Sequence, residues 1–282
     1  MDLKPADHPV ATPRYPPWRP WLAVTGVVLI VAFLTPPLAV LARRYLFVES
    51  VQFCVFAMVG PALIVLGAPW RIGRLPGGAA RLVNRLAAGR RRRTSFLLAL
   101  GFLAVWVVIC LLWRLLPVLG ALARHPALVV AEAITLCAAG IGLWLELVPS
   151  PPLAPRLAGP PRGLIATLAM WSIWVLAYIL GFAGHPVVSG YDAPGSHLAT
   201  VADQEITAFL LWAVAAASFI PVIVVALLAW LKDDAERAAA TVSTGVRGWG
   251  RPARDSRGRP GGTKGLSSGS GTAAGPRRDP VP

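Results

Sequence analysis

Six apolar runs of transmembrane length divide this sequence, and they constrain the fold more than any other feature. A helix that crosses a bilayer core needs about 20 mostly apolar residues. The runs cover residues 21–41, 47–66, 94–113, 125–148, 164–183 and 203–231. Arginines, prolines or glycines separate each run from the next, as expected for the ends of spans. The sequence therefore predicts an all-α fold, a polytopic membrane helix bundle with about six transmembrane helices.

Composition favours a membrane protein over a soluble one. Hydrophobic residues make up 56% of the chain and charged residues only 14%, whereas soluble domains are about one-quarter charged. The net charge of +14 comes from arginines between the spans and in the C-terminal tail, not from one basic face. No zinc-finger spacing, aromatic RNA-binding signature or helix-turn-helix pattern occurs, so nucleic acid is not an expected partner.

The arginines between the spans predict the orientation of the bundle. The 70–93 and 149–163 loops together carry ten arginines, while the loops on the other side carry four. By the positive-inside rule the arginine-rich side is cytoplasmic, and an even number of spans then places both termini there. Leucines and a valine are interleaved with the arginines of the 70–93 loop, which predicts a short amphipathic helix on the membrane surface, in contact with anionic lipid.

Three segments are expected along the chain. Residues 1–20 form a cytoplasmic N-terminal segment, residues 21–232 the six-span membrane domain, and residues 233–282 a cytoplasmic basic tail. After Glu236 the tail is rich in Gly, Ser, Pro and Arg without apolar periodicity, so it is predicted to be disordered.

Polar side chains from four spans are predicted to meet at the extracytoplasmic ends of these spans. Charged groups inside a bilayer are costly and usually face the bundle interior or a wet cavity. Glu49 and Gln52 lie on one face of the second span. On the fourth span, one inward stripe recurs every seven residues: His125, Glu132, Ala139 and Glu146. The predicted functional cluster consists of Glu49, Gln52, Glu132, Asp203 and Gln204.

Several of these residues have a second interpretation. Asp203 and Glu205 could belong to a functional site, but they also suit the first turn of their own helix, where acidic residues cap the helix and complement its dipole. His125 and His185 each precede a proline at a span boundary, where a histidine bonded to backbone or water fits as well as a metal ligand. Glu132 is expected to be protonated or paired with His125, because a lone carboxylate below the interface would be costly.

Known catalytic motifs are absent from the sequence. It contains no hydrolase triad, phosphate-binding loop, nucleotide fingerprint or CxxCH haem-attachment motif, so the chain is not expected to be an enzyme. Cys54, Cys110 and Cys137 lie within hydrophobic runs and show no CxxC spacing. Buried, unpaired thiols are therefore predicted.

Four short motifs occur in a recognisable order. They are SVQ with GPALIVLGAP in the second span, His125-Pro126 before the fourth, LWLELVPSPP at its end, and Asp203-Gln204 followed by LLW in the sixth. In this order they resemble the CtaG family of bacterial cytochrome c oxidase assembly factors, over about residues 20–232. The resemblance implies a multi-pass protein of the bacterial plasma membrane that works with oxidase subunits and handles copper at the outer face.

The second span departs from the family pattern. In the family this span typically opens with two histidines four residues apart, and this spacing puts both imidazoles on one helical face as metal ligands. Here these positions are Glu49 and Phe53. Copper(I) prefers thiolate, thioether and imidazole to carboxylate, so the substitutions argue against copper as a cofactor at this place. The remaining soft candidate ligands are His125, His185, Cys54 and Met58.

The sequence thus predicts a non-enzymatic membrane protein that assists maturation of a terminal oxidase, with copper delivery as the function implied by the resemblance. Two alternatives stay open. One is an ion- or proton-conducting transporter that uses the intramembrane carboxylates, and the other is a structural membrane subunit.

Overall fold

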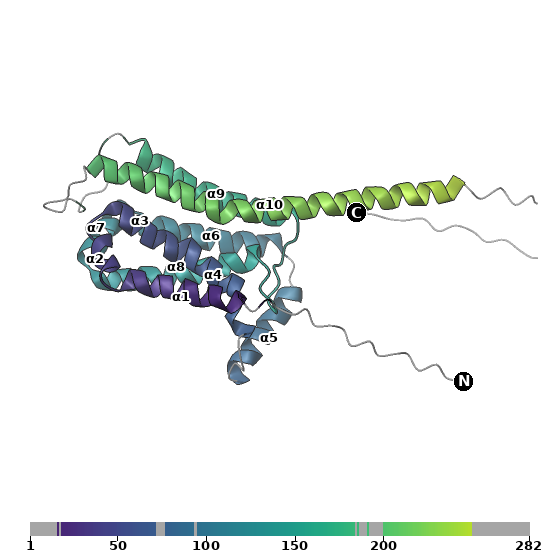
Figure 1. The fold of residues 1–282 in the computed structure, drawn as a ribbon, viewed down its shortest axis with the longest axis horizontal. Helices are drawn as coiled ribbons and strands as arrows, with labels where there is room; N and C mark the ends of the chain where they lie inside the picture. Colours follow the sequence, from purple (N-terminus) through teal and green to yellow (C-terminus); the bar gives the residue numbers. More distant parts are fainter. Residues whose placement is uncertain are drawn as a thin grey trace, which may run out of the picture. The chain divides into compact units, whose positions relative to one another are not determined.

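The described part of the chain is built from helices (Figure 1). The structure, a computed structural model, describes residues 16, 18–71, 77–92, 95–183, 185, 191 and 200–249. The α-helices are α1 (Arg19–Leu34), α2 (Leu38–Ala42), α3 (Leu46–Cys54), α4 (Gly60–Gly67), α5 (Gly77–Arg92), α6 (Phe96–Trp113), α7 (Leu116–Arg124), α8 (Pro126–Leu147), α9 (Pro160–Gly181) and α10 (Thr200–Trp249). A π-helical turn, Val55–Val59, joins α3 to α4, and a 3-10 turn, Pro69–Arg71, follows α4.

Five of the six predicted spans are long and apolar enough to cross a membrane. They are Leu46–Gly67, Phe96–Trp113, Pro126–Leu147, Pro160–Gly181 and the apolar part of α10. The first predicted span is shorter than expected: α1 has 16 residues and ends before Pro36 and Pro37, after which α2 begins. The predicted break at this pair is therefore confirmed. It arises because proline lacks the N–H that an interior helical position needs.

Two helices lie outside the spans. Helix α5 is the predicted amphipathic helix, and Figure 1 shows it at the end of the bundle where α4 ends, at an angle to the long helices. Its Arg81 and Arg85 are exposed, while Ala87 and Arg90 are buried. Helix α7 was not predicted; its Leu119 and Leu122 are buried, whereas Leu116 and Arg124 at its two ends are exposed, as in a short amphipathic helix.

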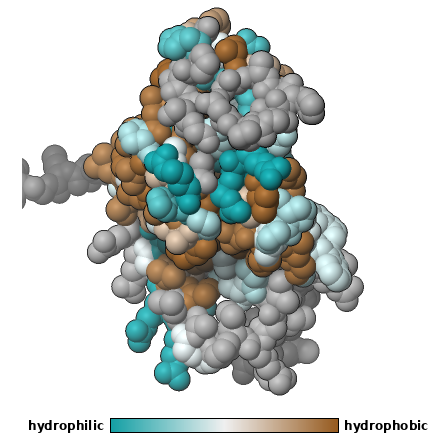
Figure 2. All heavy atoms as spheres, turned by 90° about the vertical axis from the view of Figure 1, so that its left-hand side faces the viewer, coloured by the Kyte–Doolittle hydropathy of each residue, from teal (hydrophilic) through white to brown (hydrophobic). Residues whose placement is uncertain are grey.

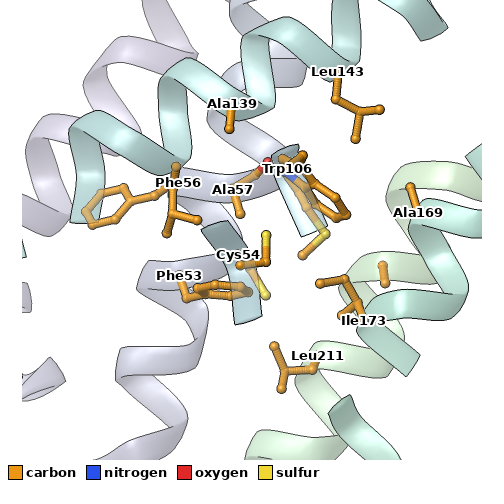
Figure 3. Packing of buried hydrophobic residues seen from close by; sticks show 14 of the residues in the cluster. Phe53, Cys54, Phe56, Ala57, Trp106, Ala139, Leu143, Ala169, Ile173 and Leu211 are labelled. Atoms are coloured by element: carbon orange, nitrogen blue, oxygen red, sulfur yellow. Dashed lines mark hydrogen bonds between the residues drawn. The ribbon is translucent and has the colours of Figure 1, made fainter. Parts of the chain in front are cut away.

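Helix α8 lies at the centre of the packing, where it contacts α4, α6, α9 and the π-helical turn. The core contains large side chains with no exposed surface, among them Phe53, Phe56 and Trp106 (Figure 3). Close approach of α8 to the second span depends on Gly140, because a Cβ there would lie 2.7 Å from the Ala57 carbonyl oxygen. Small residues at helix contacts are typical of membrane bundles, where they let backbones approach closely.

The π-helical turn in the second span has a sequence cause. Pro61 has no N–H, so it cannot donate to the carbonyl of Ala57, four residues earlier. The indole Nε1 of Trp106 on α6 donates to that oxygen instead, at 3.0 Å, and Figure 3 shows the indole beside Ala57. A buried carbonyl is thereby satisfied from a neighbouring helix, which fixes α6 against the second span.

Helix α10 continues beyond the predicted sixth span. The prediction ends this span at residue 231 and expects disorder after Glu236, but the helix reaches Trp249. The segment DDAERAAA begins this extension, and its alanines, glutamate and arginine favour a helix. The described residues fall into two units, one that ends at Ala235 and one that begins at Glu236. The predicted segments 1–20 and 233–282 fall largely outside the described residues, and their cytoplasmic location stays a prediction.

Candidate functional site

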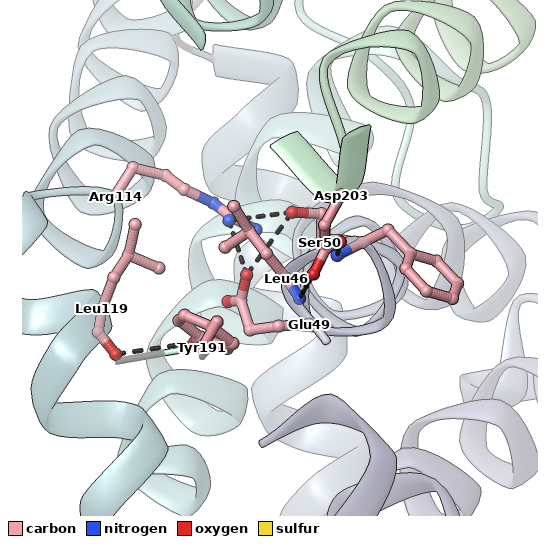
Figure 4. A network of polar contacts seen from close by, with 8 residues as sticks. Leu46, Glu49, Ser50, Arg114, Leu119, Tyr191 and Asp203 are labelled. Atoms are coloured by element: carbon pink, nitrogen blue, oxygen red, sulfur yellow. Dashed lines mark hydrogen bonds and ion pairs between the residues drawn. The ribbon is translucent and has the colours of Figure 1, made fainter. Parts of the chain in front are cut away.

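A buried ion pair joins the start of the second span to the end of α6. Glu49 lies in the first turn of α3 and is 3% exposed, and Arg114 follows the last residue of α6 and is 5% exposed. Arg114 Nη1 lies 2.6 Å from Glu49 Oε2 and 3.1 Å from Ser50 Oγ (Figure 4). The guanidinium carbon of Arg114 also lies 3.9 Å from the centre of the Phe53 ring, a cation–π geometry.

The neighbours of Arg114 keep its guanidinium protonated. Burial alone would lower the pKa of Arg114, but the carboxyl groups of Glu49 and Glu132 outweigh burial and its pKa is raised. Arg114 is therefore a permanent cation inside the bundle. Its Nε and Nη2 and the Oε1 of Glu49 have no hydrogen-bond partner among the described residues. Such a pair is expensive to break, since either partner alone is a buried, uncompensated charge.

Glu132 of α8 lies beside this pair without a partner of its own. It is 1% exposed, and neither of its carboxyl oxygens has a hydrogen-bond partner in the described part of the chain. It lines a cavity of about 10 Å³ together with Glu49, Gln52 and Tyr191. This volume holds about one water molecule. The expected pairing with His125 is not among the contacts of the described residues, and His125 is exposed.

Tyr191 also lines the cavity, and it comes from the segment between α9 and α10. Its hydroxyl lies 3.5 Å from the Leu119 carbonyl oxygen of α7, to which it donates (Figure 4). Burial, followed by the nearby carboxyl group of Glu49, raises the pKa of Tyr191. The side chain is 4% exposed and stays a neutral phenol that can donate a hydrogen bond.

Asp203 caps a helix, but not its own. Its Oδ2 accepts from the backbone N–H of Leu46 at 2.8 Å and its Oδ1 from that of Phe47 at 2.7 Å. These are the first two N–H groups of α3, which have no partner inside the helix. A carboxylate at this position also complements the positive end of the helix dipole. Asp203 therefore ties the start of α10 to the start of the second span.

The two glutamines of the predicted cluster hold backbone carbonyls. Gln52 Nε2 donates to the Phe33 carbonyl at 2.6 Å, an oxygen that Pro37 cannot reach because it has no N–H. Gln204 Nε2 donates to the carbonyls of Leu180 and His185, at 2.8 and 3.2 Å. Both glutamines therefore connect helix ends.

The candidate copper ligands are not brought together as a site. His125 and His185 are exposed, whereas Cys54 and Met58 are buried in the core. Across the described ranges, no group of three or more His, Cys, Asp or Glu side chains is arranged to hold a metal ion. Of the predicted inward stripe on α8, Glu132, Ala139 and Glu146 are buried as expected.

Figure 2 views the end of the bundle at the left of Figure 1, where α2 and α7 lie, and shows hydrophilic surface bordered by hydrophobic side chains. Arg44, Arg124 and His125 are exposed. The buried Glu49, Arg114 and Glu132 belong to the spans and helix ends beneath this region.

The sequence motifs at the other end of the second span also contact each other. Ser150 Oγ donates to the Val65 carbonyl in the last turn of α4. The indole of Trp70 lies 3.2 Å from the Ser150 carbonyl and 3.1 Å from that of Pro151. The Gly-Ala-Pro exit of one span and the PSPP segment after another are therefore one structural unit.

A family model for the cytochrome c oxidase caa3 assembly factor (Caa3_CtaG) matches residues 6–233. The chain belongs to this family. Searches of curated proteins and of solved structures gave no match. The predicted resemblance is thus confirmed, and this assembly factor is a membrane protein with five long apolar helices and one shorter one among its described residues.

The residues of this family member do not fit a copper ion on the second span. Glu49 and Phe53, the two positions where the resemblance implies histidines, both contact the guanidinium of Arg114. A guanidinium has donors only and offers no lone pair to a metal. Its fixed positive charge also opposes a second cation at the same place.

Proposed function

We propose that this protein assists the maturation of a terminal oxidase in the bacterial plasma membrane by contact with oxidase subunits, without carrying copper on its second span. Its family membership supports the assembly function, because the matched region, residues 6–233, includes the apolar helices up to Gly181 and most of the last one. The observation that carries the copper-free part is the position of Arg114. One side chain neutralises Glu49 and covers Phe53, so an internal ion pair takes the place of a metal centre.

In this proposal the predicted functional cluster has a structural role. Asp203, Gln52 and the Glu49–Arg114 pair tie α3 to the start of α10, to the last turn of α1 and to the end of α6. A bundle end built in this way presents a defined surface to a membrane partner, as satisfied buried polar networks specify one arrangement.

A deletion strain tests the assembly function. We expect less assembled oxidase in its membranes, measured from haem absorbance and oxygen consumption, and we expect wild-type protein to restore both. Added copper should not restore them. Normal holo-oxidase in the deletion strain would overturn the assembly function, while rescue by copper alone would show that copper delivery is the missing step.

A second experiment tests copper binding directly. After anaerobic loading with Cu(I) and removal of excess metal, the wild-type protein should retain far less than one copper per chain. The triple variant Glu49→His, Phe53→His, Arg114→Leu restores the family's two imidazoles and removes the opposing cation, and it should retain more. Stoichiometric copper in the wild type that survives the replacement of His125 and His185 by alanine would contradict the proposal.

One observation favours the alternative of a proton-conducting protein. Glu132 is a buried carboxyl group without a hydrogen-bond partner in the described residues, beside a cavity that holds about one water. Proteoliposomes with a pH-sensitive dye would report proton flux. Flux that Glu132→Gln abolishes would favour conduction over assembly as the function.

A further inference from the structure

A second buried charge cluster lies at the other end of α8. Glu146 is 1% exposed and is 14 positions after Glu132, which on a helix is a separation of about 21 Å. Glu146 Oε1 lies 3.0 Å from Arg90 Nη2 of α5 and 2.5 Å from Arg156 Nη1 of the loop after α8. Two guanidinium groups therefore share one carboxylate, and one positive charge is left over.

This surplus charge borders a cavity. A cavity of about 570 Å³ lies between α5, α6 and α8, and Arg85, Arg90 and Arg156 line it, while Glu146 does not. Arg85 is exposed and forms no salt bridge among the described contacts. Arg156 Nε is buried and has no hydrogen-bond partner in the described part of the chain. The polar lining of the cavity thus consists of hydrogen-bond donors that carry a net positive charge. A phosphate group needs such donors and such a charge in its binding site.

The remaining wall is apolar and continues toward the outside of the bundle. It includes Leu98 and Phe102 of α6 and Leu145 of α8. Leu86 of α5 is 52% exposed and Leu98 is 37% exposed, at the rim of the same cavity. Gly89 also lines the cavity, and a Cβ there would meet no atom within 4 Å. A soluble anion would leave this wall uncovered, whereas the acyl chains of a lipid would cover it.

We propose that this cavity is a binding site for one anionic phospholipid, with the phosphate on Arg85 and Arg156 and the acyl chains along α5, α6 and α8. Basic pockets beside membrane helices on the predicted cytoplasmic side are suited to such headgroups. The volume is in the range of small-molecule sites and accommodates a headgroup with the first part of its acyl chains. The proposal does not rest on the proposed role in oxidase assembly.

Native mass spectrometry of the delipidated full-length protein tests this site. Phosphatidylglycerol is titrated against phosphatidylcholine with the same acyl chains, and we expect one phosphatidylglycerol to bind with clear preference. Arg85→Gln should weaken its binding about fivefold, the effect of one arginine close to an anionic lipid. Gly89→Phe places an aromatic ring at the cavity wall without a change in charge and should weaken binding at least as much. Arg81→Gln removes an exposed arginine of α5 that does not line the cavity, and it is the matched control.

The possible outcomes separate the proposal from its competitors. Equal binding of the two lipids would overturn it. An equal loss in Arg81→Gln and Arg85→Gln would mean that the charge of α5 acts diffusely on a membrane surface, without a site. Displacement of the lipid by millimolar inorganic phosphate, with no effect of Gly89→Phe, would indicate a free-phosphate site instead. Arg85 is exposed and Gly89 faces open space, so both variants should keep the wild-type helix content, which circular dichroism checks.

Discussion

Arg114 and Glu49 form a 2.6 Å ion pair between the end of α6 and the start of the second span, and both side chains are buried. Buried pairs of this kind add little net stability compared with an apolar pair of the same shape, but the loss of one partner is costly. Glu49 is one of the two positions where the resemblance to the family implies a histidine. The ion pair specifies how the end of α6 meets the start of the second span.

The first prediction concerns this pair. Arg114→Leu should lower the free energy of unfolding by about 3–5 kcal/mol, because it leaves Glu49 buried and unpaired. The double variant Glu49→Leu, Arg114→Leu should recover most of that loss. Equilibrium unfolding in mixed detergent micelles, followed by near-UV circular dichroism, measures both. Arg124→Leu, an exposed arginine of α7, is the control and should change stability little. Additive effects of the two single variants would contradict the coupling.

A second prediction follows from the cap that Asp203 provides for α3. Asp203→Ala removes both acceptors and should destabilise the start of the second span by about 1–2 kcal/mol, whereas Asp203→Asn keeps one acceptor and should have a smaller effect. Hydrogen exchange at the Leu46 and Phe47 amides should become faster in Asp203→Ala. Glu205→Ala, which changes an exposed carboxylate two residues away, should leave these amides protected. Unchanged exchange at Leu46 and Phe47 would show that the cap contributes nothing.

Hydropathy alone located the five long apolar spans, because burial in lipid demands long apolar runs whatever the partners of each helix, but it made the first span longer than the 16 residues of α1. The break at Pro36 and Pro37 and the inward stripe through Glu132 and Glu146 also followed from local rules. These features depend on residues within a few turns of each other. They are therefore visible in a single sequence.

The polar contacts could not be predicted in the same way. Asp203 caps a helix that starts 157 positions earlier, and Arg114 pairs with a residue 65 positions away. Such partners depend on how each helix is rotated in the bundle, which hydropathy does not determine. Arg114 offered one signal: it directly follows an apolar span on the side with few arginines, where a cation without a partner is unfavourable. No feature of the sequence pointed to Tyr191.

A third prediction tests the bond between α6 and the second span. Trp106→Phe keeps an aromatic ring, although a smaller one, and leaves the Ala57 carbonyl without its donor, which alone should cost about 1–3 kcal/mol. Pro61→Ala restores an N–H four residues after Ala57, so the Trp106→Phe substitution should be less harmful in a Pro61→Ala background. Double-mutant analysis of unfolding free energies measures this coupling. An equal effect of Trp106→Phe in both backgrounds would mean that Pro61 does not cause the free carbonyl.

The last prediction concerns the closest helix contact at the centre of the bundle. Gly140→Ala would place a Cβ 2.7 Å from the backbone oxygen of Ala57, and a backbone atom cannot rotate away as a side chain can. The two helices must then separate, which should lower stability by about 1–3 kcal/mol, the usual effect of overpacking. Gly101→Ala on α6 meets no atom within 4 Å, so it is a matched control. It should leave stability unchanged or raise it by about 0.5–1 kcal/mol, since alanine restricts the unfolded chain more than glycine. Thermal unfolding of the two variants in the same detergent measures the difference, and similar midpoints would rule out a tight contact at Gly140.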